Sequence, residues 1–372
     1  MNDTRELRDA ARSIFDDALA AADARRALLE AVRVEGAGLR VFDERFDARA
    51  KVYSVAVGKA AAAMASGLEE RLGDSLAGGV LSAPPSGLKL STRWRVFEGG
   101  HPLPNEASME AARAAFELLD EADASSALVL FLVSGGGSAM LEQPRGARVT
   151  LEDLREANRL LVSCGAAIDE VNAVRRALSA VKGGGLSLRA PRATQVTLIV
   201  SDVPRGRERD VASGPTLAPP PDSPHAREVV ARYGLDSKLP DSIKRLLEEE
   251  APRAADGDAR SSSGSRAPRS HYVLLDNDGA CEAAAESARS RGFAVERAPD
   301  ISEQPVGEGA SLLASRLFEA YARDGAGGRG VCLVSGGEFA CPVRGGGTGG
   351  RNSETALRCA FEFERALGER EA

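Results

Sequence analysis

Three short apolar runs in this chain end abruptly in small or polar residues. Residues 127–133 lead into Ser-Gly-Gly, residues 330–334 into a second Ser-Gly-Gly, and residues 196–200 into Ser-Asp. Continuous apolar runs of this length predict strands that are buried on both faces of a sheet. One Ser-Gly-Gly could merely turn the chain. Three such ends predict a binding site, because ligands of open α/β sheets bind at the carboxyl ends of the strands.

Helical and strand patterns alternate along the rest of the chain, which is typical of an α/β protein. Further strands are expected at 52–57, 79–83, 94–97, 271–275 and 293–296. Helices are expected from the Asp3 cap to about Leu28, and at 58–72, 108–119, 150–161, 170–181, 224–233, 241–250, 279–291, 309–323 and 352–367, with Ser108 and Thr150 as caps.

A chain of 372 residues is too long for one ordinary core, so two domains are expected. Residues 252–270 have no hydrophobic periodicity and are rich in Ser, Gly, Arg and Pro, which is typical of a linker or loop. The predicted first domain is therefore 1–251, and the predicted second domain is 271–372.

Composition argues against several classes of protein. The net charge is −7, and no basic block is interleaved with aromatics, so a nucleic-acid binder is not expected. No apolar stretch reaches membrane-spanning length, and the charged N-terminus lacks the apolar core of a signal peptide. Five scattered cysteines without a Cys-x-x-Cys pair predict reduced thiols in the cytoplasm, and with three histidines they disfavour a Cys/His metal site.

Gly58 and Lys59 lie where a predicted strand gives way to a helix. A lysine near a helix N-terminus can bind phosphate, although a lone lysine is more often a surface residue. A Walker A loop is excluded, because Tyr53 stands where its first glycine is needed and Ala60 replaces its Ser or Thr.

The loop Ser134, Gly135, Gly136, Gly137 and Ser138 is a stronger signal than Lys59. Three consecutive glycines between two serines suit a loop that holds an oxyanion with backbone N–H groups and hydroxyls. We therefore expect this loop to bind phosphate or carboxylate oxygens.

A second glycine-rich loop precedes the last predicted helix and contains Gly347, Gly349, Gly350, Arg351 and Asn352. It formally matches Gly-x-Gly-x-x-Gly, but the βαβ unit and the acidic residue of a dinucleotide site do not follow. The guanidinium of Arg351 can hold a phosphate through two hydrogen bonds. The alternative interpretation is a glycine-rich loop with a solvated arginine.

Three further residues are candidates on local grounds. Asp202 ends a predicted strand and could bind Mg²⁺ or accept a hydroxyl proton, or it could cap a turn. His101 could contact a substrate or close a turn. Lys182, before three glycines, could bind an anion or interact with a helix C-terminus.

Several motifs occur in an order that resembles one known family. They lie at 57–60, 100–106, 132–138, 178–184, 201–204, 212–216, 335–338 and 349–352. Together they resemble the class II glycerate kinases, or glycerate 2-kinases, which carry a C-terminal MOFRL domain. The resemblance covers nearly the whole chain.

The resemblance implies a Rossmann-like N-terminal α/β domain and a smaller MOFRL-type α/β domain, with the active site in the cleft between them. It implies transfer of a phosphoryl group from ATP to D-glycerate with Mg²⁺. The family's catalytic lysine, aspartate and arginine correspond to Lys59, Asp202 and Arg351, with Asp202 also as metal ligand. Nucleotide binding is expected at the two glycine loops named above and at Lys182, and substrate binding at His101, Ser335 and Glu338. The resemblance also implies that the partners are small molecules, D-glycerate and ATP. It does not specify the oligomeric state.

The chain departs from the family pattern at three places. Arg205-Gly206-Arg207 stands where members carry Gly-Asp-Asp, and Arg176-Ala177 replaces Lys-His. Members also continue beyond the position of Ala372 with a further strand and an acidic segment, so a shortened second domain is expected. ATP-dependent glycerate 2-kinase is the predicted function. The alternatives are an impaired homologue that still binds nucleotide or a small acid, and a hydroxypyruvate reductase.

Overall fold

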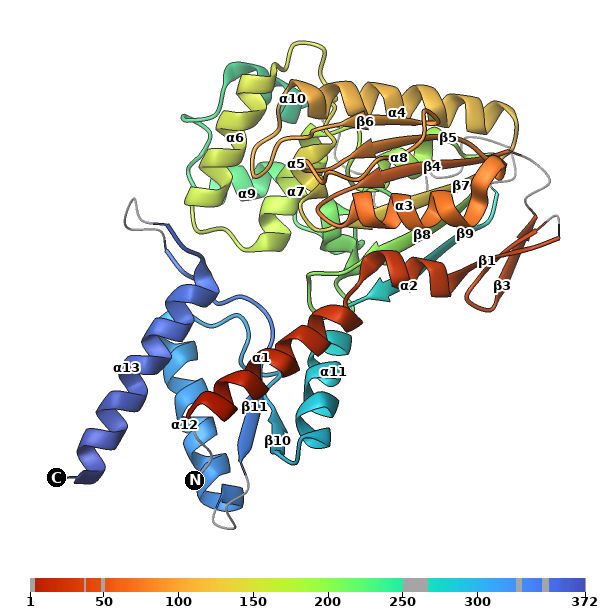
Figure 1. The fold of residues 1–372 in the computed structure, drawn as a ribbon. Coiled ribbons are helices and arrows are strands. Elements are labelled where there is room, and N and C mark those ends of the chain that lie inside the picture. Colours follow the sequence, from red (N-terminus) through yellow and green to blue (C-terminus); the bar gives the residue numbers. More distant parts are fainter. Residues whose placement is uncertain are drawn as a thin grey trace. The chain divides into compact units, whose positions relative to one another are not determined.

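The structure is a computed structural model that describes residues 4–36, 38–47, 51–249, 267–325, 330–342 and 348–371. The chain divides into two compact units (Figure 1). The larger unit is Ala24–Leu274, and the smaller unit joins Met1–Asp23 to Leu275–Ala372. Both units contain parallel strands and helices, which confirms the predicted two-domain α/β class.

The larger unit is built on a six-stranded sheet with the order β6-β5-β4-β7-β8-β9. These strands are β4 (Val52–Val57), β5 (Leu76–Ser82), β6 (Trp94–Phe97), β7 (Leu128–Ser134), β8 (Thr194–Val200) and β9 (Arg269–Leu275). The chain enters the sheet at β4, proceeds outward to β6, and then returns to the other side of β4 with β7. This strand order is that of a Rossmann-like fold, and its topological switch point lies between β4 and β7.

The apolar runs of β4 and β7 form the centre of this sheet, as predicted. Every residue of both strands is buried, and the two strands pair in parallel with Val57 opposite Val133. The parallel pairing continues from β7 to β8, with Ser134 opposite Val200. The carboxyl ends of the three strands therefore lie next to one another.

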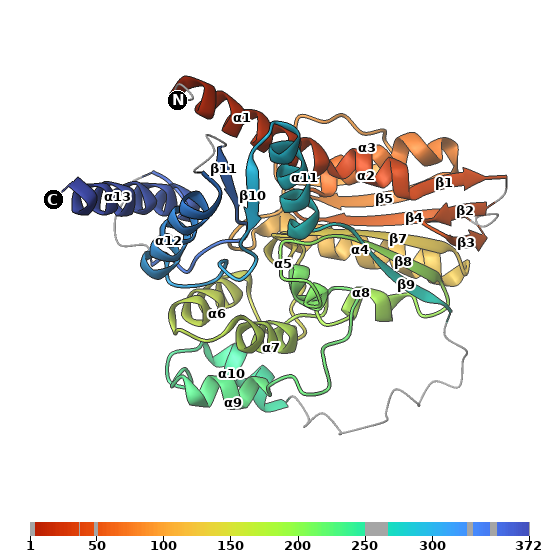
Figure 2. The same cartoon turned by 90° about the horizontal axis from the view of Figure 1, so that it is seen from below.

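Helices cover both faces of this sheet, with α3 (Ala61–Leu72) on one side and α4 (Glu106–Ala124) on the other (Figures 1 and 2). Alanines of α4, including Ala111 and Ala115, pack against Phe131 of β7 in one core cluster. The cap residue is Asn105, three residues before the predicted cap Ser108, and its side chain accepts a hydrogen bond from the Ser108 N–H at 2.9 Å.

A helical layer with its own apolar core is formed by segments that lie between β7 and β8 and between β8 and β9 along the chain. It consists of α6 (Leu151–Ser163), α7 (Ile168–Leu178), α9 (Ala226–Arg232) and α10 (Asp241–Glu249). Thr150 caps α6 as predicted, and its hydroxyl accepts from the Asp153 N–H at 3.2 Å. The shorter elements of the larger unit are η1 (Gly73–Ser75), α5 (Gly137–Met140), α8 (Gly185–Arg189) and η2 (Glu208–Ser213).

One sheet of the larger unit was not predicted. The strands β1 (Val32–Glu35), β2 (Gly38–Val41) and β3 (Glu44–Asp47) form an antiparallel meander. The long N-terminal helix that the sequence predicts is in fact two helices, α1 (Thr4–Ala21) and α2 (Ala24–Ala31).

The smaller unit pairs two short parallel strands, β10 (Ala294–Arg297) and β11 (Val331–Val334). Its helices are α1, α11 (Asn277–Ser290), α12 (Val306–Asp324) and α13 (Arg351–Glu371). The residues of β11 are half-buried, so the prediction that this run is buried on both faces is wrong.

Two predicted domain boundaries differ from the observed units. Helix α1 belongs to the smaller unit because its Ile14 packs against Ala284 and Ala288 of α11. Strand β9 belongs to the larger unit because it pairs with β8. Most of the predicted linker lies outside the described residues. Within the described part of the chain, no helix is both long and apolar enough to cross a membrane.

Candidate active site

The end of β4 is tied to the end of β7 by backbone and side-chain hydrogen bonds. The Lys59 N–H donates to the Gly135 carbonyl at 2.9 Å, and the Ala60 N–H donates to the Ser134 hydroxyl at 3.0 Å. Gly58 has φ +116°, and a Cβ there would lie 2.4 Å from the Ser134 carbonyl oxygen. Glycine is therefore required at position 58, and the turn places the exposed Lys59 side chain just before α3.

The glycines after β7 leave room for side chains from other elements. A Cβ on Gly135 would lie 1.8 Å from the Asp202 carboxylate oxygen Oδ2. A Cβ on Gly136 would lie 3.1 Å from Cδ2 of His101 and 3.2 Å from Cγ of Lys59. The structure thus brings Lys59, His101 and Asp202 together around Gly135 and Gly136, at the topological switch point of the sheet.

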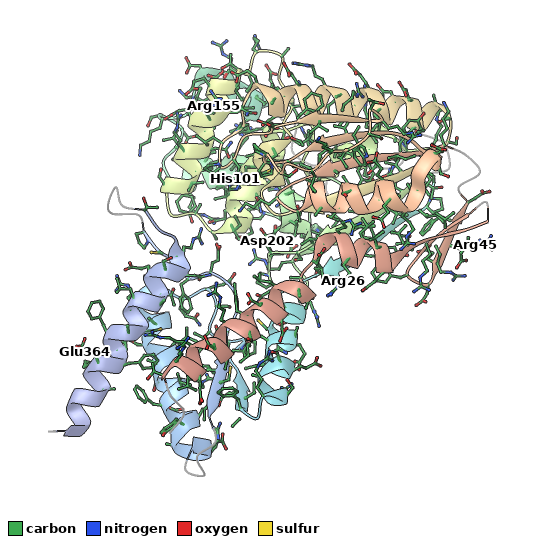
Figure 3. The ribbon with its side chains drawn as sticks, viewed as in Figure 1. Arg26, Arg45, His101, Arg155, Asp202 and Glu364 are labelled. Carbon is green, nitrogen blue, oxygen red and sulfur yellow. The ribbon has the colours of Figure 1, made fainter. Side chains whose placement is uncertain are left out.

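His101 and Asp202 lie at the same end of the larger unit (Figure 3). The pKa of His101 is lowered by partial burial and further by the positive charge of Lys59, while the negative charge of Asp202 opposes these effects. A lowered pKa favours the neutral imidazole at pH 7, so His101 can both donate and accept a hydrogen bond.

Asp202 follows the end of β8 and is exposed. No group of three or more His, Cys, Asp or Glu side chains among the described residues could hold a metal ion. Mg²⁺ is often held by one or two carboxylates together with substrate phosphates and water. The single carboxylate of Asp202 beside a glycine loop therefore fits Mg²⁺ that is bound largely through phosphate oxygens.

The second Ser-Gly-Gly lies in the smaller unit. The Ser335 hydroxyl donates to the Ile301 carbonyl at 2.9 Å, and Arg351 forms a 3.4 Å ion pair with Glu338. Both charged side chains are more than half exposed. Gly349, Gly350 and Asn352 are exposed at the start of α13, whereas Gly347 lies outside the described residues. Of the predicted site residues in the smaller unit, the structure brings Arg351 and Glu338 together.

Comparison with known proteins identifies the family. The family model described as a domain of unknown function, DUF4147, matches residues 10–248. The glycerate 2-kinase of Pyrococcus horikoshii is 34% identical over 354 residues, which span 95% of this chain and 78% of that protein. The chain belongs to the class II glycerate kinase family.

Other members of the family are informative about fold and function. The crystal structure of the Thermotoga maritima glycerate kinase matches with a TM-score of 0.75 and 29% identity, covering 96% of this chain and 80% of that one. A protein of Agrobacterium vitis that is 34% identical over 367 residues, 97% of this chain and 77% of that protein, is named a putative hydroxypyruvate reductase. The family fold is therefore clear, and a functional assay must include both reactions.

Lys182 is placed differently from the other predicted site residues of this glycerate kinase family member. Its side chain is 2% exposed and forms an ion pair with Glu142, which also accepts from the Ser179 hydroxyl at 2.5 Å. Burial lowers the pKa of Lys182, and the charge of Glu142 opposes that effect. These contacts support a structural role, while nucleotide binding by Lys182 stays a prediction.

A buried polar group that the sequence does not predict lies behind the glycine loop. Ser213 and Asn172 are 1% and 2% exposed, and the Ser213 hydroxyl lies 2.9 Å from the Ser138 hydroxyl. The motif 212–216 contained Ser213 as part of the family resemblance. Its position depends on a left-handed backbone at Ala212 and Ser213, with φ +51° and +60°, which a local pattern does not reveal.

Proposed function

We propose that this chain transfers the terminal phosphoryl group of ATP to the 2-hydroxyl of D-glycerate and forms 2-phosphoglycerate. The observation that carries the proposal is the gathering of Lys59, His101 and Asp202 around a glycine loop at the switch point of a Rossmann-like sheet. The relatives named glycerate kinase support the choice of substrate.

Phosphoryl transfer requires positioning and charge stabilisation more than covalent chemistry. Gly135 and Gly137 are buried and leave room for Asp202 and Ala212, whereas Gly136 is partly exposed, so phosphate oxygens can approach the backbone of the loop at Gly136. Lys59 would neutralise the charge that grows on the transferring group, because its ammonium group extends from a turn that is fixed by hydrogen bonds to β7.

Asp202 and His101 would act on the acceptor side of the reaction. Asp202 would orient the glycerate hydroxyl or hold Mg²⁺, and Mg²⁺, when bound, would neutralise phosphate charge. His101 would bind the substrate as a neutral imidazole, consistent with its lowered pKa. The proposal retains nucleotide binding by Gly349, Gly350, Arg351 and Asn352, and substrate binding by Ser335 and Glu338, as predictions.

One departure from the family pattern is compensated within the chain. Arg207 stands where the family pattern has an aspartate. Its guanidinium forms a 3.1 Å ion pair with Asp210. The added positive charge is therefore partly neutralised locally. The pairing answers the argument from added charge, whereas the carboxylates of the family pattern are not restored at 206 and 207.

A two-arm assay tests the proposal. The chain is incubated with D-glycerate and Mg-ATP and followed for ADP and 2-phosphoglycerate, and separately with hydroxypyruvate and NAD(P)H. We expect turnover in the first arm at an ordinary kinase rate, roughly 1–100 per second, and none in the second. Nucleotide or glycerate binding without turnover would favour the impaired homologue, and oxidation of NAD(P)H would favour the reductase.

A further inference from the structure

A chain of hydrogen bonds leads from the glycine loop into the protein. The hydroxyls of Ser138 and Ser213 are 2.9 Å apart, and the Ser213 hydroxyl is 2.9 Å from Oδ1 of Asn172. The Asn172 amide nitrogen Nδ2 lies 3.3 Å from Oδ1 of Asp210. Ser138 is half-buried at the outer end of this chain, while Ser213 and Asn172 are buried.

The chemistry of these groups determines which atom donates at each step. The carboxylate of Asp210 can only accept, so the amide group of Asn172 must direct Nδ2 toward Asp210 and Oδ1 toward Ser213. Oδ1 can only accept, so Ser213 donates its hydroxyl proton to Asn172. Ser213 must then accept from Ser138, and the single hydroxyl proton of Ser138 is directed into the protein.

Two arginines contact Asp210, which is the inner end of this series of hydrogen bonds. Arg207 Nε donates to Oδ2 of Asp210 at 3.1 Å, and Arg176 Nη1 lies 4.0 Å from Oδ1. Both arginines can only donate, so the Asp210 oxygens act as acceptors in these contacts as well.

The backbone around Ser213 is constrained to make the contact with Ser138. Ala212, Ser213 and Gly214 all have left-handed φ values, +51°, +60° and +66°. The Gly183 N–H donates to the Ser213 carbonyl at 3.1 Å, and the Gly184 N–H donates to the Gly214 carbonyl at 2.7 Å. Such a conformation persists where its surroundings hold it, and it is frequent at functional sites.

We propose that Ser138 is a substrate-binding residue that accepts a hydrogen bond from a hydroxyl of the hydroxy-acid substrate, and that Ser213, Asn172 and Asp210 are positioning residues that fix this polarity. The inference rests on the proposed function. It replaces the expectation that Ser138 donates to nucleotide phosphate, because ionised phosphate oxygens are acceptors and do not match the lone pairs that Ser138 presents.

The test compares Ser138→Ala, Ser213→Ala and a matched control in the full chain. The control is Ser187→Ala, which removes a serine that is 1% exposed and donates to Oε1 of Gln195 at 2.6 Å. KM values for D-glycerate and for Mg-ATP are measured for each variant, together with calorimetric Kd values for each ligand. We expect Ser138→Ala and Ser213→Ala to raise the D-glycerate constants roughly tenfold and those for Mg-ATP less than twofold. Ser187→Ala should change neither.

Asp210→Asn provides a second test if Ser213→Ala fails to fold. An amide at position 210 can donate as well as accept, so the Asn172 side chain can exchange the positions of Oδ1 and Nδ2. KM and Kd for D-glycerate should therefore rise, by a smaller factor than in Ser213→Ala. Equal or larger effects on Mg-ATP in the variants, wild-type constants in Ser213→Ala, or an equal effect of Ser187→Ala would overturn the inference. Failure of the proposed function is distinguished from these results because the wild-type chain itself would not phosphorylate D-glycerate.

Discussion

The same pentapeptide, Leu-Val-Ser-Gly-Gly, has two very different environments in this molecule. The copy at 132–136 ends a fully buried central strand, and its Ser134 is 1% exposed and accepts from the Ala60 N–H. The copy at 333–337 ends a half-buried strand, and its exposed Ser335 donates to the Ile301 carbonyl. In the first copy the serine fixes the turn that carries Lys59, and in the second it closes a local loop contact.

The comparison shows that neighbouring strands, more than the pentapeptide, determine what the glycines do. Strand β7 lies at the topological switch point, so side chains following β4 and β8 converge on Gly135 and Gly136. Beside Gly336 the nearest groups are the side chains of Asn277 and Cys281 at the start of α11. Lys59, His101 and Asp202 therefore gather at the first copy, while Asn277, Cys281 and an exposed ion pair lie near the second copy.

The buried Lys182–Glu142 ion pair and the exposed Arg351–Glu338 ion pair should differ strongly in how much they contribute to the free energy of unfolding. Lys182→Met leaves Glu142 buried without its partner and should lower the free energy of unfolding by about 3–5 kcal/mol. Arg351→Ala removes an exposed partner of Glu338 and should change it little. Urea denaturation of both variants measures the difference. Similar losses would show that the two environments are energetically alike.

Lys59→Ala should reduce kcat by a factor on the order of 10² or more without a matching loss of stability, because an exposed lysine contributes little to folding. The control is Lys51→Ala, an exposed lysine at the opposite end of the same strand, which should retain wild-type kcat. Steady-state kinetics and thermal melts test both variants. Wild-type turnover in a folded Lys59→Ala variant would remove this lysine from the mechanism.

Alanine substitution of the first glycine in each pentapeptide distinguishes the two copies directly. Gly135→Ala places a methyl group on the Asp202 carboxylate and should displace it, lowering kcat roughly ten- to a hundredfold with a small change in Tm. Gly336→Ala crowds Asn277 and Cys281 and should act mainly on Tm. The contrast is lost if Gly336→Ala reduces kcat as much as Gly135→Ala at equal Tm.

The titration of His101 reports on the charges at the first copy. Lys59→Met should raise the pKa of His101 because it removes a positive charge, and Asp202→Asn should lower that pKa further. The folded wild-type chain binds fewer protons at His101 than the unfolded chain, whose pKa is about 6.5. As pH falls from about 6.5 through the lowered pKa of His101, the unfolded state takes up a proton more readily than the folded state. The contribution of His101 to the free energy of unfolding is therefore present above about pH 6.5 and is lost over this range. NMR titration of the His101 ring measures the shifts, and identical titrations in all three proteins would mean that these charges are not neighbours.

The sequence predicted the central strands and their convergent ends because long apolar runs specify burial without reference to distant partners. It missed β1, β2 and β3, whose four-residue lengths give too little periodicity. The amphipathic face of α1 predicted a helix but did not specify the unit against which it packs. The roles of Lys182 and Ser213 could not be read locally, because Glu142 and Asn172, their partners, lie about 40 residues away in sequence.

A crystal structure of the chain with D-glycerate and a nonhydrolysable analogue of Mg-ATP tests the central claim most directly. The account predicts that the terminal phosphate lies within hydrogen-bond distance of Lys59 Nζ and the Gly135–Gly137 loop, with a glycerate hydroxyl donating to Ser138. A terminal phosphate that contacts the second Ser-Gly-Gly and makes no contact with Lys59 would contradict it.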